Sequence, residues 1–423
     1  MNNFTSQETL TVNLKQKSRL KWVAEFAKKQ ILNRLQQTRF GVLTLIDGES
    51  KHMFGQLSKS CIEATITVHD ERFYGEIAFG GSIGAGEAYM LGYWSADNLT
   101  NVIRLMCVNQ SVMDSLEGGY QWLTKPLMKV LHWLNSNTTE GSRKNIAAHY
   151  DLGNEMFALF LDPTMMYSSA IFTQKTKTLQ AASELKLETI CNKLDLKPSD
   201  HVLEIGTGWG GFAIYAVNNY GCKVTTTTIS TQQYELAKSR VISAGLQDKI
   251  TLLLEDYRHL TGTFDKLVSI EMIEAVGHQY YDTYFAKVSK LLKPEGLACI
   301  QAITITDQRF ESAKNSVDFI QRYIFPGSCI PSNTAMLSSI TKVSDLRLFD
   351  LEDIGPHYAT TLRIWRKNFF DNIDQVRKLG YSEEFIKMWE FYLCYCEGGF
   401  AERALGDVHL LLAKPDNRRA TLV

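Results

Sequence analysis

The sequence predicts an α/β protein built on a doubly wound, mostly parallel sheet, with a smaller N-terminal α+β domain. Beyond residue 198, short runs rich in Val, Ile and Thr alternate with segments of helical periodicity. This alternation is typical of parallel strands joined by crossover helices. The chain has 423 residues, of which 45% are hydrophobic and 22% charged, an ordinary globular composition. A chain of this length is expected to form two or three domains.

The N-terminal third contains three runs with strand character, at 40–46, 64–70 and 73–80. They are rich in aromatic and β-branched residues and are bounded by turn residues. The Gly-rich stretch 80–94 lacks the Lys and Ser/Thr of a phosphate loop, so we expect its glycines to allow turns and close packing. Residues 98–135 have a helical pattern.

A polar stretch at 135–145 is the best candidate for a linker. It divides the chain into an N-terminal domain at 1–134 and a C-terminal domain at 146–423. In the C-terminal domain, helices are expected after the first, second and fourth strands. Because ligands bind such sheets at the carboxyl ends of the strands, those ends are where a site is expected. The expected strands lie within 199–211, 221–230, 249–257, 264–274 and 296–305.

The charge of the chain nearly cancels, with a formal net of -1, which argues against a nucleic-acid binder. The eight cysteines form no CxxC pair, so we expect free thiols and no metal site. The polar N-terminus has no signal-peptide core, and no apolar stretch is long enough to span a bilayer, so a soluble cytoplasmic protein is expected.

One segment is strongly basic: residues 15–39 hold eight Lys/Arg and one Glu, with apolar residues at roughly helical spacing. A basic amphipathic helix can lie on an anionic membrane, because its apolar residues enter the interface and its cations meet lipid phosphates. The alternative is a first helix that packs on its own domain.

A carboxylate and a run of glycines follow the first strand of the C-terminal domain, as Glu204-Ile-Gly206-Thr-Gly208-Trp-Gly210-Gly211. The spacing satisfies GxGxxG, the dinucleotide pattern, but that pattern also needs an acid about 20 residues later, for a ribose hydroxyl. The second strand ends instead in four threonines, 225–228. An acid two residues before the first glycine is typical of loops that bind S-adenosylmethionine (SAM). We therefore predict SAM, with NAD as the alternative.

Several motifs, in order, make the chain resemble the cyclopropane-fatty-acyl-phospholipid synthase family, which includes mycolic acid cyclopropane synthases. They include HYDLGN (149–154), VLEIGTGWGG (202–211), MIEAVG (272–277), LKPEG (292–296) and YCEGGF (395–400). The resemblance implies the class I SAM-methyltransferase fold and an N-terminal domain that contacts lipid or membrane. It also implies an enzyme that acts on cis double bonds of membrane phospholipids, peripheral at the inner membrane surface, as a homodimer.

The resemblance also implies the SAM-binding residues. Tyr167 and Ser168 would touch SAM, and Glu204 would orient the glycine loop. Asp256 and Tyr257 would flank the adenine, although a helix cap and a core aromatic are the alternatives for these two. The remaining residues are Gly206, Thr207, Gly208, Trp209 and Gly210 in the loop, and Thr228, Ser230 and Gln233 around the ribose and methionine.

The family's reaction leaves a carbocation, from which a base must remove a proton. The resemblance implies that this base is a bicarbonate ion, held by a Cys backbone region, a Glu, a His, an Ile backbone and a Tyr. Glu274, Ile303 and Tyr358 match three of these positions, but Ser169 stands where the family has Cys and Gln301 where it has His.

These two departures leave the product open. Ser and Gln can donate hydrogen bonds to an anion, but they cannot carry the charge of an imidazolium. A cyclopropane fatty acid is expected, and a methyl-branched or methylene fatty acid is the alternative. A lipid-binding protein without catalysis is a further hypothesis. Cys396 matches a cysteine regarded as an active-site residue in the family, and a buried structural thiol is the alternative for it.

Overall fold

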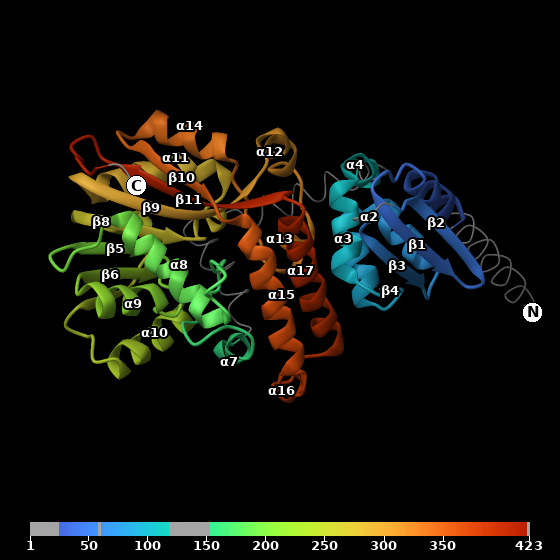
Figure 1. Ribbon diagram of the computed structural model, residues 1–423, viewed down its shortest axis with the longest axis horizontal. Coiled ribbons are helices and arrows are strands. Elements are labelled where there is room, and N and C mark those ends of the chain that lie inside the picture. Colours follow the sequence, from blue (N-terminus) through green and yellow to red (C-terminus); the bar gives the residue numbers. More distant parts are fainter. Residues whose placement is uncertain (1–24, 58–60, 118–152, 421–423) are drawn as a thin grey trace, which may run out of the picture. The chain divides into compact units, whose positions relative to one another are not determined.

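The computed structural model describes residues 25–57, 61–117 and 153–420. The chain divides into two compact units (Figure 1). The first contains the described residues before 118 together with Ser382–Gly398, and the second contains the described residues 153–381 and those from Gly399 onward. No sequence pattern predicts that Ser382–Gly398 belongs with the N-terminal residues. The expected linker at 135–145 lies outside the described residues, so that boundary stays a prediction.

The N-terminal unit is built on a four-stranded sheet of order β2-β1-β3-β4. β1 is parallel to β3, and the other two pairs are antiparallel. The strands expected at 40–46 and 64–70 are confirmed as β1 and β3, whereas no expectation covered β2 and β4. The strands are β1 (Gly41–Asp47), β2 (Ser50–Gln56), β3 (Glu63–Val68) and β4 (Trp94–Ala96).

The expectation of a strand at 73–80 is wrong, because this run lies in helix α2 (Arg72–Met90). Its buried residues Tyr74, Ala78 and Gly81 recur at helical spacing. Aromatic and β-branched residues fit either element when they are buried, so composition alone misleads here. The glycines do allow close packing, since a Cβ on Gly84 would lie 1.9 Å from the Glu76 carbonyl oxygen.

The other helices of this unit are α3 (Leu99–Val108), α4 (Gln110–Glu117) and most of α17 (Glu383–Ala401). A further helix covers 25–35, the described part of the basic segment. Its residues Ala27, Ile31 and Leu35 are buried, and Lys28 pairs with Asp47 of β1. This part of the helix therefore packs on its own unit, as the alternative expectation has it. Residues 15–24 lie outside the described part of the chain.

The second unit carries a seven-stranded sheet of order β10-β11-β9-β8-β5-β6-β7. The five strands expected from sequence are confirmed, and they are mutually parallel. β11 runs antiparallel to both of its neighbours. The strands are β5 (His201–Ile205), β6 (Lys223–Thr228), β7 (Ile250–Leu254), β8 (Phe264–Ile270), β9 (Leu292–Ile305), β10 (Arg347–Asp353) and β11 (Leu405–Ala413).

Helices cover both faces of this sheet (Figure 1). α8 (Leu179–Leu194), α9 (Gly211–Tyr220) and α10 (Thr231–Ser243) share one apolar core with the sheet. α11 (Tyr281–Leu291) and α14 (Asn333–Val343) share the other. The predicted doubly wound α/β fold is therefore confirmed. The remaining helices are α7 (Asn154–Ala158), α12 (Asp307–Ala313), α13 (Phe319–Tyr323), α15 (Gly355–Asp371) and α16 (Ile373–Lys378), with 3-10 turns η2 (Tyr257–His259), η3 (Ile273–Ala275) and η4 (His278–Tyr280).

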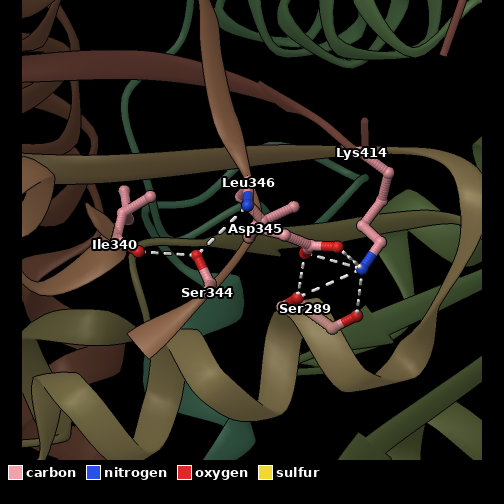
Figure 2. A network of polar contacts seen from close by, with 6 residues as sticks. All are labelled: Ser289, Ile340, Ser344, Asp345, Leu346 and Lys414. Carbon is pink, nitrogen blue, oxygen red and sulfur yellow. Dashed lines mark hydrogen bonds and ion pairs between the residues drawn. The ribbon is translucent and has the colours of Figure 1, made fainter. Parts of the chain in front are cut away.

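A polar network fastens the end of β11 to α11 (Figure 2). Lys414 Nζ donates to both carboxylate oxygens of Asp345 at 2.7 Å, and Ser289 Oγ of α11 donates to the same carboxylate at 2.7 Å. The network thus joins three segments that are distant in the sequence. Among the described residues, no helix is long and apolar enough to cross a membrane.

Candidate active site

The glycine loop lies between β5 and α9 and has a conformation that only glycine adopts easily. Gly206, Gly208 and Gly210 have φ of 100°, 51° and 84°, in the left-handed region that disfavours other residues. The backbone N–H groups of Gly206 and Thr207 both donate to the Thr227 carbonyl at 3.0 Å, which fixes the loop on β6. A Cβ on Gly208 would meet no protein atom within 4 Å, so the loop has room beside it there.

Glu204 lies directly before this loop and is buried, with 1% of its surface exposed. Its Oε2 has no hydrogen-bond partner among the described residues, and burial raises the pKa of its carboxyl to about 8. A buried acceptor without a donor costs free energy. The loop therefore carries an acceptor that a ligand can satisfy.

The end of β6 supplies a compact polar group. Thr228 and Gln233 are joined by a 2.9 Å hydrogen bond between their side chains, and Ser230 Oγ accepts from the Gln233 backbone N–H at 3.3 Å. Ser230 is thus the N-cap of α10. Thr207 Oγ1 lies 2.7 Å from Thr226 Oγ1. The structure brings the loop residues and the β6 residues to the same edge of the sheet.

The aromatic residues near the loop pack tightly. Trp209 is buried, donates to Asn154 Oδ1 at 2.7 Å and lies 5.0 Å from the Phe157 ring. Tyr167 is partly exposed and lies between the rings of Phe157 and Trp365, at 5.1 and 5.3 Å. Asn154 and Trp209 therefore tie the HYDLGN motif to the glycine loop.

Asp256 and Tyr257 follow β7. Asp256 caps η2, and its carboxylate accepts from the Arg258 backbone and guanidinium at 2.6–2.9 Å. Burial would raise the pKa of this carboxyl, but the bonds from Arg258 hold it below its usual value. Tyr257 packs edge-on against Tyr284 at 5.6 Å. Asp256 is therefore a helix cap and Tyr257 a packed aromatic, as the two alternative expectations have it. Contact of these residues with an adenine stays a prediction.

Glu271 directly follows β8, lies beside Gln301 of β9 and is the centre of a polar cluster. Its Oε1 accepts from the Ser169 backbone N–H at 2.8 Å and from Gln301 Nε2 at 2.7 Å. Its Oε2 accepts from the Tyr358 hydroxyl at 2.6 Å. Gln301 Nε2 also donates to Asp407 Oδ2 at 2.8 Å. Three predicted site residues thus meet through a carboxylate that the sequence analysis did not single out.

Glu274 and Ile303 form a second contact nearby. The Ile303 backbone N–H donates to Glu274 Oε1 at 2.5 Å, whereas Glu274 Oε2 has no partner among the described residues. Burial, followed by the charge of Glu271, raises the pKa of Glu274 to about 8. Glu274 therefore carries a carboxylate oxygen that is free to act on a bound molecule.

The charges of the cluster are unbalanced. Asp407 is fully buried, and burial and the neighbouring carboxylates Glu271 and Glu274 raise its pKa well above the usual value. Lys186 is the cation facing them: it is fully buried, donates to Ser168 Oγ at 2.7 Å, and burial lowers its pKa to about 8. Burial and mutual repulsion favour the protonated form of these carboxyls, and a cation that enters beside them favours their ionised form.

Glu271, Asp407 and Lys186 are functional candidates that sequence reasoning missed. Lys186 lies among the buried residues of α8. A lysine at an apolar position of a helix is the sequence signal that could have revealed it. Glu271 directly follows a strand, where sites in such sheets are found. Cys396 lies in α17 of the N-terminal unit, with a partly exposed side chain, so its catalytic role stays a prediction.

A family model described as mycolic acid cyclopropane synthetase matches residues 137–410, more than half of the chain. The chain belongs to this family. Among curated relatives, it is 40% identical to the tuberculostearic acid methyltransferase of Mycobacterium tuberculosis over 76% of each chain. It is 37% identical to the cyclopropane-fatty-acyl-phospholipid synthase of Escherichia coli over 80% of this chain and 85% of that one.

Solved structures agree. The cyclopropane synthase MmaA2 of Mycobacterium tuberculosis superposes with a TM-score of 0.60 at 29% identity, covering 64% of this chain and 98% of that one. The mycolic acid cyclopropane synthase CmaA1, solved with SAH, gives a TM-score of 0.58 at 29% identity, with the same coverage. The chain described here is therefore a SAM-dependent C-methyltransferase with the class I methyltransferase fold, and SAM is its methyl donor.

Proposed function

We propose that this enzyme adds the methyl carbon of SAM to a cis double bond of a phospholipid acyl chain and closes a cyclopropane ring. The observation that carries the proposal is the group of three neighbouring carboxyls at Glu271, Glu274 and Asp407, of which Glu274 and Asp407 are buried and Glu271 is partly exposed. An alkene that takes up a methyl cation becomes a carbocation. Fixed negative charge and aromatic faces stabilise such a cation far better than a neutral apolar wall does.

Aromatic rings accompany these carboxylates. Tyr358, whose hydroxyl holds Glu271, stacks on Phe400 at 4.4 Å and meets Trp365 edge-on at 6.0 Å. Its ring is thereby fixed from two sides. We assign to this group, with Glu274, the stabilisation of the cationic acyl carbon.

We propose that SAM is held at the glycine loop and the ends of β6 and β7. The loop fits this ligand, because Gly208 leaves space where a Cβ would stand and Glu204 has an unsatisfied oxygen. When bound, SAM supplies an electrophilic methyl group. The proposed contacts are those predicted from sequence: Tyr167, Ser168, Glu204, Gly206, Thr207, Gly208, Trp209, Gly210, Thr228, Ser230, Gln233, Asp256 and Tyr257.

A second product, a methyl-branched or methylene fatty acid, is favoured by one finding. The relative with 40% identity is named a tuberculostearic acid methyltransferase, whereas the synthase from Escherichia coli is 37% identical. Both products pass through a methylated carbocation. Ring closure removes a methyl proton directly, a methylene group forms when a hydride shift moves the cation to the methyl-bearing carbon before a methyl proton leaves, and an unsaturated methyl-branched chain forms when a proton leaves from a chain carbon instead.

An isotope experiment tests the proposal. Purified enzyme is incubated with SAM carrying a trideuterated methyl group and vesicles of monounsaturated phospholipid, and the acyl chains are analysed by mass spectrometry and NMR. We expect loss of one deuterium together with ring-methylene signals. Loss of one deuterium with exomethylene signals, or retention of all three, would replace the cyclopropane with the second product. Absence of any labelled acyl chain would refute lipid methylation.

We also propose that the enzyme works at a membrane surface. The acyl chain of a phospholipid lies in the bilayer interior, so an enzyme that modifies it must meet the lipid there. The cations of the basic segment at 15–39 are the candidate for this contact, because cations attract anionic lipid head groups, whereas its apolar residues Ala27, Ile31 and Leu35 pack on their own unit.

A further inference from the structure

We propose that Glu271 is the proton acceptor of the reaction and occupies the place where the family resemblance implies a bicarbonate ion. The inference rests on the proposed function, because it assigns the base for that reaction. It names a residue that no sequence motif singled out.

The donors implied for bicarbonate are already used. The Ser169 backbone N–H, Gln301 Nε2 and the Tyr358 hydroxyl all donate to the Glu271 carboxylate, at 2.8, 2.7 and 2.6 Å. The Ile303 backbone N–H donates to Glu274. These are the positions at which the resemblance places the anion's partners. The residues present therefore do not fit a bicarbonate ion in addition to Glu271.

The local charge leads to the same conclusion. The charge of Glu271 raises the pKa of Glu274, and the charges of Glu271 and Glu274 raise the pKa of Asp407. The buried Lys186 faces this group. In the described part of the chain, the four donors at these positions are already bonded to Glu271 and Glu274, so a further anion would enter against the carboxyls of Glu271, Glu274 and Asp407. A carboxylate that is covalently part of the chain avoids the loss of freedom that binding a separate ion entails.

The backbone holds Glu271 in an unusual conformation. Its φ is 47°, in the left-handed region that residues other than glycine seldom adopt. The strain is compensated, because its N–H donates to the Gln301 carbonyl at 2.9 Å while its side chain accepts from the Gln301 amide. Such strained positions cluster at functional sites. Here the hydrogen bonds hold Glu271 in this conformation, which directs its carboxylate to the three donors.

The step is balanced without any other reactant. A C–H bond of the transferred methyl group breaks, and its electron pair closes the ring onto the cationic carbon. The proton goes to a Glu271 oxygen. Burial raises the pKa of Glu271, which makes it a better base than an exposed carboxylate, and a positioned base of this kind contributes about 10²–10⁴-fold in rate.

The test compares the unchanged enzyme with Glu271→Gly and Glu271→Gln, in buffer purged of carbon dioxide and with bicarbonate added back. We expect the unchanged enzyme to turn over equally in both buffers. Both variants should lose turnover by about 100-fold or more. Bicarbonate should partly restore Glu271→Gly, which frees the three donors, and should not restore Glu271→Gln, whose amide still fills the space. Glu295→Gln, at an exposed position, is the matched control.

Two results would overturn the inference. One is an unchanged enzyme that loses turnover when bicarbonate is removed and regains it on addition. The other is either variant working at the unchanged rate in purged buffer. Thermal unfolding and SAM affinity, measured on each variant, separate loss of the base from loss of the fold.

A binding measurement keeps the inference testable if the proposed function fails. Carbon-13 bicarbonate is titrated by NMR into the unchanged protein and into Glu271→Gly, without substrate. We expect line broadening with the variant only. Equal broadening with both, or none with either, would show that Glu271 does not fill an anion site. Absence of acyl methylation by the unchanged enzyme would instead refute the proposed function alone.

Discussion

At the scale of single residues, two neighbouring carboxylates have different surroundings. Glu271 accepts three hydrogen bonds, whereas Glu274 accepts one and keeps an oxygen without a partner among the described residues. A fully bonded carboxylate is held in one place, which suits a base that must meet one C–H bond. A carboxylate with a free oxygen suits stabilisation of positive charge.

We expect Glu274→Gln to keep SAM affinity within about twofold and to lose turnover by about 100-fold, because an amide cannot ionise beside the cationic carbon as the Glu274 carboxyl, with its pKa of about 8, can. The amide oxygen still accepts from the Ile303 N–H, so the stability of the fold should change by less than about 1 kcal/mol. Calorimetric SAM titration and turnover on vesicles measure the two effects separately.

Gly208→Ala is the control for Glu274→Gln, because it should lower SAM affinity, which Glu274→Gln should leave nearly unchanged. Its Cβ meets no protein atom, so any loss of SAM affinity reflects the space of the ligand and the positive φ of the loop. Full turnover of Glu274→Gln would remove the role assigned to Glu274. Unchanged SAM affinity of Gly208→Ala would move the SAM site away from the loop.

At the scale of elements, the site is made where strand ends converge. β5, β6, β8 and β9 are parallel and end at one edge of the sheet. β11 runs the other way, so Asp407, near its start, reaches the same edge beside Gln301. At the other end of β11, Lys414 contacts Asp345, which also accepts from Ser289 (Figure 2).

We expect Asp345→Asn to destabilise the fold by about 0.5–1 kcal/mol near neutral pH, a modest value because the carboxylate is half exposed. Burial raises the pKa of Asp345, but the bonds from Lys414 and Ser289 outweigh it and lower the pKa below the usual value. The stabilisation is therefore present above the unfolded-state pKa and is lost as pH falls through the folded-state pKa.

Urea unfolding of both proteins across this pH range measures the effect of Asp345→Asn. The difference between them should shrink toward acid. A difference that is constant with pH would mean that lost packing, not charge, is responsible. Asp416→Asn, an exposed aspartate on the same segment, should change stability little at any pH.

At the scale of the whole molecule, the chain combines a methyltransferase unit with an N-terminal unit that recruits Ser382–Gly398 from far along the sequence. Tyr89 donates to Glu390 at 2.7 Å, and Thr100 donates to Glu397 at 3.1 Å, so α17 is bonded to this unit by buried or partly buried pairs. The YCEGGF motif therefore begins in one unit and ends in the other.

We expect the full chain to co-sediment with anionic vesicles and to dissociate as salt rises from about 0.05 to 0.5 M, because ions screen the attraction between cations and head groups. Replacing Lys15, Lys17, Arg19 and Lys21 by Gln should weaken binding at least tenfold. The matched control replaces four exposed lysines of the methyltransferase unit, and equal weakening there, or binding that salt does not change, would contradict the role of the basic segment. These lysines are Lys223, Lys238, Lys290 and Lys378.

The sequence by itself determined the alternating strands and helices, the glycine loop and the family, because periodicity and loop chemistry are local properties. The strand expected at 73–80 is a helix, because buried aromatic residues fit a helix as well as a strand. Only the tertiary structure decided which groups meet at the site. Ser169, Gln301 and Tyr358 are 57 to 189 residues apart, and their shared partner Glu271 is defined by packing of strand ends and α15 rather than by any spacing along the chain.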